Sequence, residues 1–188
     1  MFDVFLPVRL SLSARSSMSG PQRSRRPARP VVAEVPLRLQ FEPRARESRR
    51  TKLLSSRGEK LIITSEGAEP AWFGPTVQAL SELLKLSSGW NSYGARPVDI
   101  GLVRSALELM AATMRPDTPP PSVVPTSRGG VQLEWHLGGI DLEVEVLAPG
   151  HFSVAYEDSG DGDDWEAELR GSDLKVLEEA LDKLAQRS

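Results

Sequence analysis

The sequence of 188 residues has no cysteine and only two histidines. Without cysteine, disulfide bonds and cysteine-ligated zinc sites are excluded, and two histidines leave few ways to build a classical zinc centre. No window approaches the roughly 18 consecutive apolar residues that cross a bilayer. We therefore expect no membrane segment, no metal and no cofactor, and a location in the reducing cytoplasm.

Recognisable catalytic motifs are also lacking. The chain has no glycine-rich phosphate loop, no metalloprotease helix and no cysteine–histidine pair. The segment around Ser92 is not a Gly-x-Ser-x-Gly nucleophile elbow, because Trp90 stands two positions before the serine. The sequence thus gives no direct indication of an enzyme.

Charge is distributed unevenly along the chain. Residues 1–60 hold 14 Lys and Arg against 5 Asp and Glu, whereas residues 61–188 hold 9 against 21. The first part is also poor in aromatic residues, so it cannot bury enough apolar surface to offset its ordering entropy. We predict that residues 1–58 form a disordered basic arm and residues 59–188 a single domain. Met18 is a candidate translation start, which would leave residues 1–17 upstream of the protein.

The basic arm has three candidate roles. It can be a solvated linker, it can contact nucleic acid without sequence preference through Arg23–Arg50, or it can dock on the acidic domain or another protein. Its arginines have no interleaved aromatic residues for base stacking, so sequence-specific recognition is not predicted. Val31–Phe41 alternates apolar and polar residues and is a candidate edge strand or partner-binding segment.

Three segments have the apolar spacing of amphipathic helices. The first is expected to begin at a Thr76 cap and to end near Ser87–Gly89. The second should run from an Asp99 cap to about Met114, and the third should start at a Ser172 cap. The apolar stripe of the third helix is Leu174, Leu177, Leu181 and Leu184.

Between residues 123 and 156 the apolar period changes to 2, which is typical of β-strands. Val131–His136 and Ile140–Val146 alternate on either side of Gly138–Gly139, a two-residue hairpin turn. The register set by this turn pairs Trp135 with Leu142, Leu133 with Val144 and Val131 with Val146 on the buried face.

Further short strands are expected at residues 60–64, 123–124, 152–156 and 165–169. The sequence therefore predicts an α+β fold, in which an antiparallel meander of four to five strands is covered on one face by two to three helices.

The hairpin register also gathers polar side chains on the face opposite the apolar one. It places His136 opposite Asp141, Glu134 opposite Glu143, and Gln132 opposite Glu145. Like charges directly opposite each other destabilise a sheet, so the two facing glutamates require a cation, a shared proton, an arginine or plain solvent. The candidate roles are a surface for a basic partner, a weak divalent-metal site, or a solvated face.

Two loops also have side chains that suit binding. Residues 89–94 place Trp90, Asn91 and Tyr93 between glycines, either as a binding site or as an inter-helix connection in which both aromatic rings plug the end of the core. Residues 157–166 are rich in carboxylates, but no frame reproduces the ligand order of an EF-hand. We interpret this second segment as a solvated hairpin loop, with weak calcium binding as the alternative.

Residues 89–95 (Gly-Trp-Asn-Ser-Tyr-Gly-Ala) and 123–136, which include Gly-Gly-Val-Gln-Leu-Glu-Trp, resemble a family of short, uncharacterised bacterial proteins. That family pairs a Gly-Trp-Asp/Asn-x-Tyr-Gly-Ala loop with a strand of this sequence. The resemblance covers about residues 85–157 and leaves out the arm. It implies a bacterial origin, a cytoplasmic location and one compact domain, and it carries no catalytic residue over.

The leading functional hypothesis is a non-enzymatic bacterial binding module of the antitoxin, immunity or defence-accessory type. It would use the acidic sheet face against a protein partner with a basic surface. The alternatives are a metal-assisted hydrolase that uses the same carboxylates, and a nucleic-acid binder that acts through the arm.

Overall fold

The computed structural model describes residues 11–16 and 50–188, and of residues 11–16 it describes the backbone. The elements in chain order are β1 (Ser11–Ser16), β2 (Arg50–Ser56), β3 (Glu59–Ser65), α1 (Phe73–Leu83), α2 (Ile100–Thr113), β4 (Ser122–Pro125), β5 (Val131–Leu137), β6 (Ile140–Ala148), β7 (His151–Asp158), β8 (Asp163–Arg170) and α3 (Lys175–Gln186). The predicted disorder of residues 1–10 and 17–49 lies outside the described residues, as does the strand suggested for Val31–Phe41.

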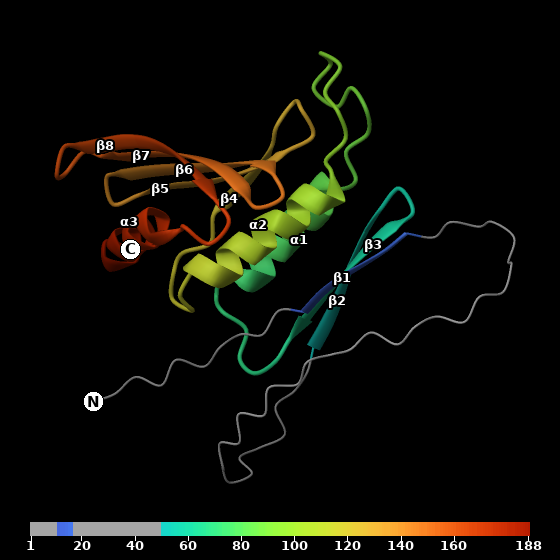
Figure 1. The fold of residues 1–188 in the computed structure, drawn as a ribbon, viewed down its shortest axis with the longest axis horizontal. Helices are drawn as coiled ribbons and strands as arrows, with labels where there is room; N and C mark the ends of the chain where they lie inside the picture. The colour runs from blue at the N-terminus through green and yellow to red at the C-terminus, as the bar shows by residue number, and fades with distance from the viewer. Residues whose placement is uncertain (1–10, 17–49) are drawn as a thin grey trace, which may run out of the picture.

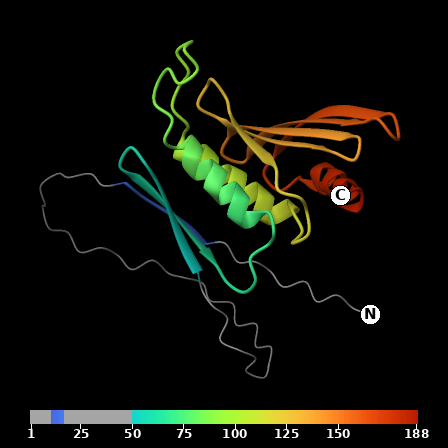
Figure 2. The ribbon, with the colours of Figure 1, turned by 180° about the vertical axis from the view of Figure 1, so that it is seen from behind.

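The predicted α+β class and the meander are confirmed. Strands β4 to β8 form one antiparallel sheet in chain order, and β1, β3 and β2 form a second antiparallel sheet. Figures 1 and 2 show α1 and α2 between the two sheets, with α3 against the same face of the larger sheet. One face of the five-stranded sheet is therefore covered by helices, and no element among residues 11–16 and 50–188 covers the other.

The predicted register of the β5–β6 hairpin is also confirmed. Trp135 pairs with Leu142 and Leu133 with Val144, and all four side chains are buried. The turn at Gly138–Gly139 has positive φ at both residues, a conformation that glycine adopts without steric cost. Since the side-chain period of a strand is 2, this register fixes which residues of both strands face the helices.

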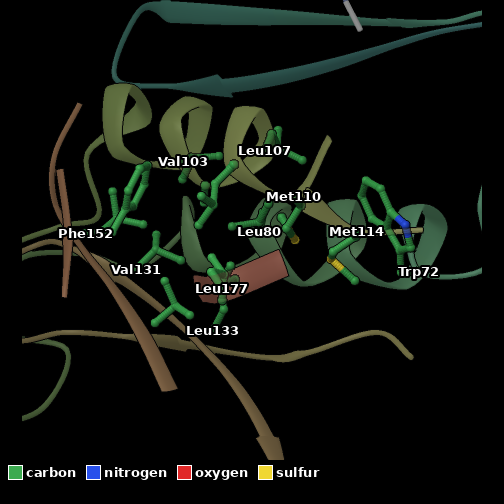
Figure 3. Close-up of a cluster of buried hydrophobic side chains, with 14 of the residues drawn as sticks. Trp72, Leu80, Val103, Leu107, Met110, Met114, Val131, Leu133, Phe152 and Leu177 are labelled. Carbon is green, nitrogen blue, oxygen red and sulfur yellow. The ribbon is translucent and has the colours of Figure 1, made fainter. Parts of the chain in front are cut away.

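The core lies between the helices and the five-stranded sheet. Figure 3 shows side chains of α1, α2, α3 and the sheet meeting in one cluster. From α2 come Val103, Leu107 and Met110, which are fully buried as their helical spacing predicts. The helix begins where predicted, because the Asp99 carboxylate accepts hydrogen bonds from the backbone N–H groups of Gly101 and Leu102.

The other two helices begin elsewhere than predicted. Helix α1 starts three residues before the expected Thr76 cap, with Trp72 at its N-cap, so Thr76 lies inside the helix with its hydroxyl buried. Helix α3 starts after Leu174 rather than at a Ser172 cap. In both cases burial of apolar side chains fixes the helix position, and the first turn forms without a side-chain cap.

The predicted boundary at residue 58 is wrong, because β2 (Arg50–Ser56) belongs to the folded domain. It pairs with β3 across a two-residue turn in which Arg57 and Gly58 both have positive φ. Leu54 of β2 and Leu61 and Ile63 of β3 are buried in the common core. This sheet therefore covers the side of α1 and α2 that the meander leaves open.

Candidate functional site: the acidic sheet face

Carboxylates gather on the face of the five-stranded sheet that no helix covers. We call this surface the acidic face; the strand registers place on it Glu134, Asp141, Glu143, Glu145, Glu157, Asp164, Glu166 and Glu168. Among the strand positions of this face, Arg170 at the end of β8 is the one arginine, and there is no lysine. The surface is therefore strongly negative at neutral pH.

The predicted hairpin residues lie where the register places them. His136 is opposite Asp141, Glu134 is opposite Glu143, and Gln132 is opposite Glu145. The side chain of Gln132 lies beside the facing pair Glu134 and Glu143 and bonds to both. Its side-chain amide donates to Glu134 Oε1 and to Glu143 Oε2, both at 3.0 Å. This bridge satisfies acceptors on both carboxylates without cancelling their charge.

Both histidines of the chain lie beside carboxylates of this face. His136 Nδ1 is 2.5 Å from Asp141 Oδ1, and His136 Nε2 is 3.6 Å from Glu134 Oε2. The hydrogen bond to Asp141 raises the pKa of His136 above its usual value, with a further contribution from Glu134. His151 Nε2 contacts Glu168 Oε2 at 2.9 Å, and this hydrogen bond lowers the pKa of Glu168.

A shallow, open depression lies over β6, β7 and β8. Its floor is Ala155 of β7, which pairs with Glu143 of β6 on one side and Glu166 of β8 on the other. One step along β7, Ser153 lies in the same way between Glu145 and Glu168. Two rows of carboxylates thus flank a floor of small side chains.

The geometry does not suit a resident metal ion. Among residues 11–16 and 50–188, no three histidine or carboxylate side chains are placed to hold one. His136, Glu134 and Asp141 instead contact one another in a row that is open to solvent at His136 and Asp141. The row is not enclosed by a pocket that would strongly desolvate a general acid or base.

Three of the carboxylates in residues 157–166 have cationic partners from the third helix and its end. Arg187 contacts Asp158 and Asp161, and Lys183 contacts Asp161 and Asp163. The Asp158 side chain is fully buried, and its bond to Arg187 at 2.6 Å lowers its pKa far below the usual value. Residues 159–164 are exposed at the turn from β7 into β8, as expected for a solvated hairpin loop, and the ion pairs of Asp158, Asp161 and Asp163 also attach the C-terminal segment to it.

The loop of Trp90, Asn91 and Tyr93 does not join the acidic face. The expectation that both rings plug the core is wrong for Tyr93, which is 92% exposed, while Trp90 is half-buried. This loop lies next to the connection that precedes β5, and His136 lies at the other end of β5. The structure therefore separates the predicted binding residues into two places.

Half of the carboxylates of the acidic face were not predicted from the sequence. Residues Glu157, Asp164, Glu166 and Glu168 belong to it because β7 and β8 pair directly across a short turn. The signal was present in the alternation of Trp165, Ala167 and Leu169 with three carboxylates.

Comparisons of the chain with protein-family models, with curated proteins and with solved structures gave no match. The resemblance of residues 89–95 and 123–136 to a bacterial family therefore stays a prediction. None of the helices in the described part of the chain is both long and apolar enough to cross a membrane.

Proposed function

We propose that the protein is a non-enzymatic binding module whose acidic face holds an extended basic segment of a partner protein. The observation that carries this proposal is the pair of carboxylate rows on β6 and β8 with Ala155 and Ser153 between them. A surface of one charge that the fold itself leaves uncovered attracts and orients a partner of the opposite charge.

The spacing of the two rows suits an extended chain. Alternate residues of a strand are about 7 Å apart, so Asp141, Glu143 and Glu145 repeat with the period of every second side chain of an extended peptide. The rows on β6 and β8 are about 10 Å apart, because two inter-strand spacings separate them. A basic segment lying over β7 can therefore direct its side chains to both rows.

Exposure argues for binding rather than catalysis. Glu143, Glu166 and their neighbours lie on an open sheet, where water screens their charge and no pocket excludes it. Exposed carboxylates act as hydrogen-bond acceptors for Arg and Lys. The hydrolase alternative needs a metal site, which the placement of the donors does not favour.

The finer part of the proposal concerns the kind of module. We propose that it is a cytoplasmic bacterial accessory protein of the antitoxin, immunity or defence type. This assignment rests on the sequence resemblance of residues 89–95 and 123–136 and on the acidic surface. In any of these roles the acidic face would bind a basic partner. Contact of Arg23–Arg50 with nucleic acid is the alternative for the arm, which lies outside the described residues except for Arg50.

A steric block of the depression tests the proposal without changing any charge. The variant Ala155→Trp fills the floor between Glu143 and Glu166, and Ala112→Trp, at an exposed position of α2, is the matched control. The probe is a fluorescent peptide of about ten residues that alternates arginine and threonine, and its affinity is measured by anisotropy. We expect Ala155→Trp to weaken binding about tenfold and the control to leave it unchanged.

A second peptide of the same composition, with its arginines in one contiguous block, should bind more weakly to the unmodified protein. Equal affinity for both peptides, or full binding by Ala155→Trp, would show that the face attracts cations without holding an extended segment.

A further inference from the structure

Three connections meet at the end of the molecule where β5 begins. The Arg57 side chain in the β2–β3 turn donates to Val98 O at 3.0 Å, and Arg96 N donates to Ser127 O at 2.9 Å. Asp99 N donates to Gly129 O at 2.9 Å. Figures 1 and 2 show the segment before α2 between the β2–β3 turn and the β4–β5 connection. The segment 89–99 therefore has a fixed place on the body of the domain.

The loop at the tip of this segment is held by its own backbone. Asn91 Oδ1 accepts hydrogen bonds from Tyr93 N at 2.9 Å and from Ala95 N at 3.1 Å. Gly89 N donates to Ala95 O at 2.8 Å, and the Trp90 indole N–H donates to Arg96 O at 3.2 Å. None of these bonds uses the Tyr93 side chain. The loop therefore keeps its shape independently of the tyrosine ring.

Tyr93 is the most exposed of the large apolar side chains in the described part of the chain, at 92%. An aromatic ring in water on a pre-formed loop contributes nothing to the core. Because the loop is already ordered, a ligand that stacks on the ring does not have to order the backbone first.

Three arginines without carboxylate partners lie in segment 89–99 and in the two connections that contact it. Arg57, Arg96 and Arg128 are exposed, and none forms an ion pair with the described residues. The nearby Asp99 is occupied as the cap of α2. Elsewhere in the described chain, Arg104, Arg115, Arg170 and Arg187 all pair with carboxylates. At this end of the molecule, which we call the loop end, the three guanidinium groups have no carboxylate partner and can bind an anionic ligand.

We propose that this end of the molecule binds single-stranded nucleic acid. The Tyr93 ring stacks on an unpaired base, and Arg57, Arg96 and Arg128 hold the flanking phosphates. Stacking on an aromatic ring beside a cationic track is the general physical basis of single-strand binding, and it needs no sequence-specific hydrogen bonds. The acidic face is a separate surface, since its carboxylates lie on the strands β5 to β8 and none of them belongs to the loop of residues 89–95.

The exposed ring favours nucleic acid over an acidic protein as the ligand. Arginines alone would serve either polyanion, because both present negatively charged oxygens. A base adds a flat π surface that an acidic side chain lacks, and Tyr93 is the group that can use it. The proposal is independent of the acidic face. That face consists of different residues, and it attracts cations, whereas the arginines attract anions.

Fluorescence anisotropy of the full chain with labelled (dT)12 and (rU)12 tests this site. We expect Tyr93→Ala to weaken binding about tenfold and Tyr93→Phe to leave it within about twofold, because the ring alone provides the stacking. Binding to a duplex of equal length should not respond to Tyr93→Ala, since paired bases are not free to stack. The arm is present in every variant, so differences between variants report the loop.

The double variant Arg96→Gln/Arg128→Gln should reduce the slope of log affinity against log salt by about 1.4, which corresponds to two single-strand phosphates. Its matched control is Arg115→Gln/Lys175→Gln, which removes the same charge from exposed positions after α2 and at the start of α3 and should leave the slope unchanged. Unchanged (dT)12 and (rU)12 affinity in Tyr93→Ala overturns the proposal. The proposal is also overturned if polyglutamate binds as tightly as (dT)12 and loses as much affinity in the Arg96→Gln/Arg128→Gln variant.

Discussion

At the scale of single residues, Trp135 links the inner face of the sheet to the segment that precedes β4. Its ring is 4% exposed on the inner face of the sheet, and its indole N–H donates to Pro119 O at 2.9 Å. Trp135→Ala should lower the free energy of unfolding by about 3–5 kcal/mol, because it leaves a cavity and an unsatisfied carbonyl. Urea unfolding measures this, with Tyr93→Ala as a control that changes stability by less than about 0.5 kcal/mol. A loss below about 1 kcal/mol for Trp135→Ala would contradict the buried position.

Asp158 is the residue that should govern stability in acid. Its carboxylate accepts hydrogen bonds from Arg187, from two backbone N–H groups and from the Tyr156 hydroxyl, and these hold its pKa below the usual value. A lowered folded-state pKa means that the ionised group stabilises the fold above the ordinary aspartate pKa, and that this contribution is lost as the pH falls below it.

We therefore expect the melting temperature of the protein to fall as the pH decreases from about 4 toward 2. Compared with the unmodified protein, Asp158→Asn should have a lower melting temperature at pH 7. Its melting temperature should also change less than that of the unmodified protein between pH of about 4 and 2. The exposed Asp173→Asn variant is the control and should follow the unmodified protein. Parallel acid profiles for Asp158→Asn and the unmodified protein would show that this carboxylate does not set the acid sensitivity.

At the scale of elements, the sequence predicts best where two signals agree. In the β5–β6 hairpin, the alternation of apolar residues and the Gly138–Gly139 turn specify one register, and both the buried pairs and the Glu134–Glu143 pair follow from it. In α2, the Asp99 cap and the apolar stripe coincide in the same way.

Prediction fails where tertiary packing decides alone. Strand β2 is rich in charge and has Leu53 exposed beside the buried Leu54, so no clean alternation reveals it. Helix α1 starts at Phe73 because that ring and the ring of Trp72 are buried, and no side-chain cap marks the position. Tyr93 could not be placed either, since an aromatic ring in a glycine loop is more often buried.

The hairpin also contains a pH-sensitive element of the binding surface. His136 lies between Asp141 and Glu134, and its raised pKa keeps it positively charged to a higher pH than usual. Affinity for the alternating basic peptide should therefore increase as the pH rises through this pKa, because the imidazolium no longer offsets the carboxylates. His136→Asn should remove this increase. An identical pH profile in His136→Asn, measured by anisotropy between about pH 5 and 8, would assign the change to another group.

At the scale of the whole molecule, the fold sorts charge into different places. The five-stranded sheet presents an acidic surface, and the end of the molecule where β5 begins presents the exposed Arg57, Arg96, Arg128 and Tyr93. The net charge of −3 hides this arrangement. The sequence showed the uneven charge along the chain, but the pairing of β7 with β8 was needed to extend the acidic surface across three strands.

The binding of a basic segment by the acidic face is tested most directly by reversing charge on both rows. The variant Glu143→Lys/Glu166→Lys changes one carboxylate on each side of Ala155, and Glu178→Lys/Glu179→Lys makes the same change on an exposed part of α3. The measurement is the affinity for the alternating arginine–threonine peptide as a function of salt. We predict that the first variant binds at least about tenfold more weakly with a shallower salt dependence, and that the second binds as the unmodified protein does. Equal losses in the two variants, or none in the first, would contradict the account.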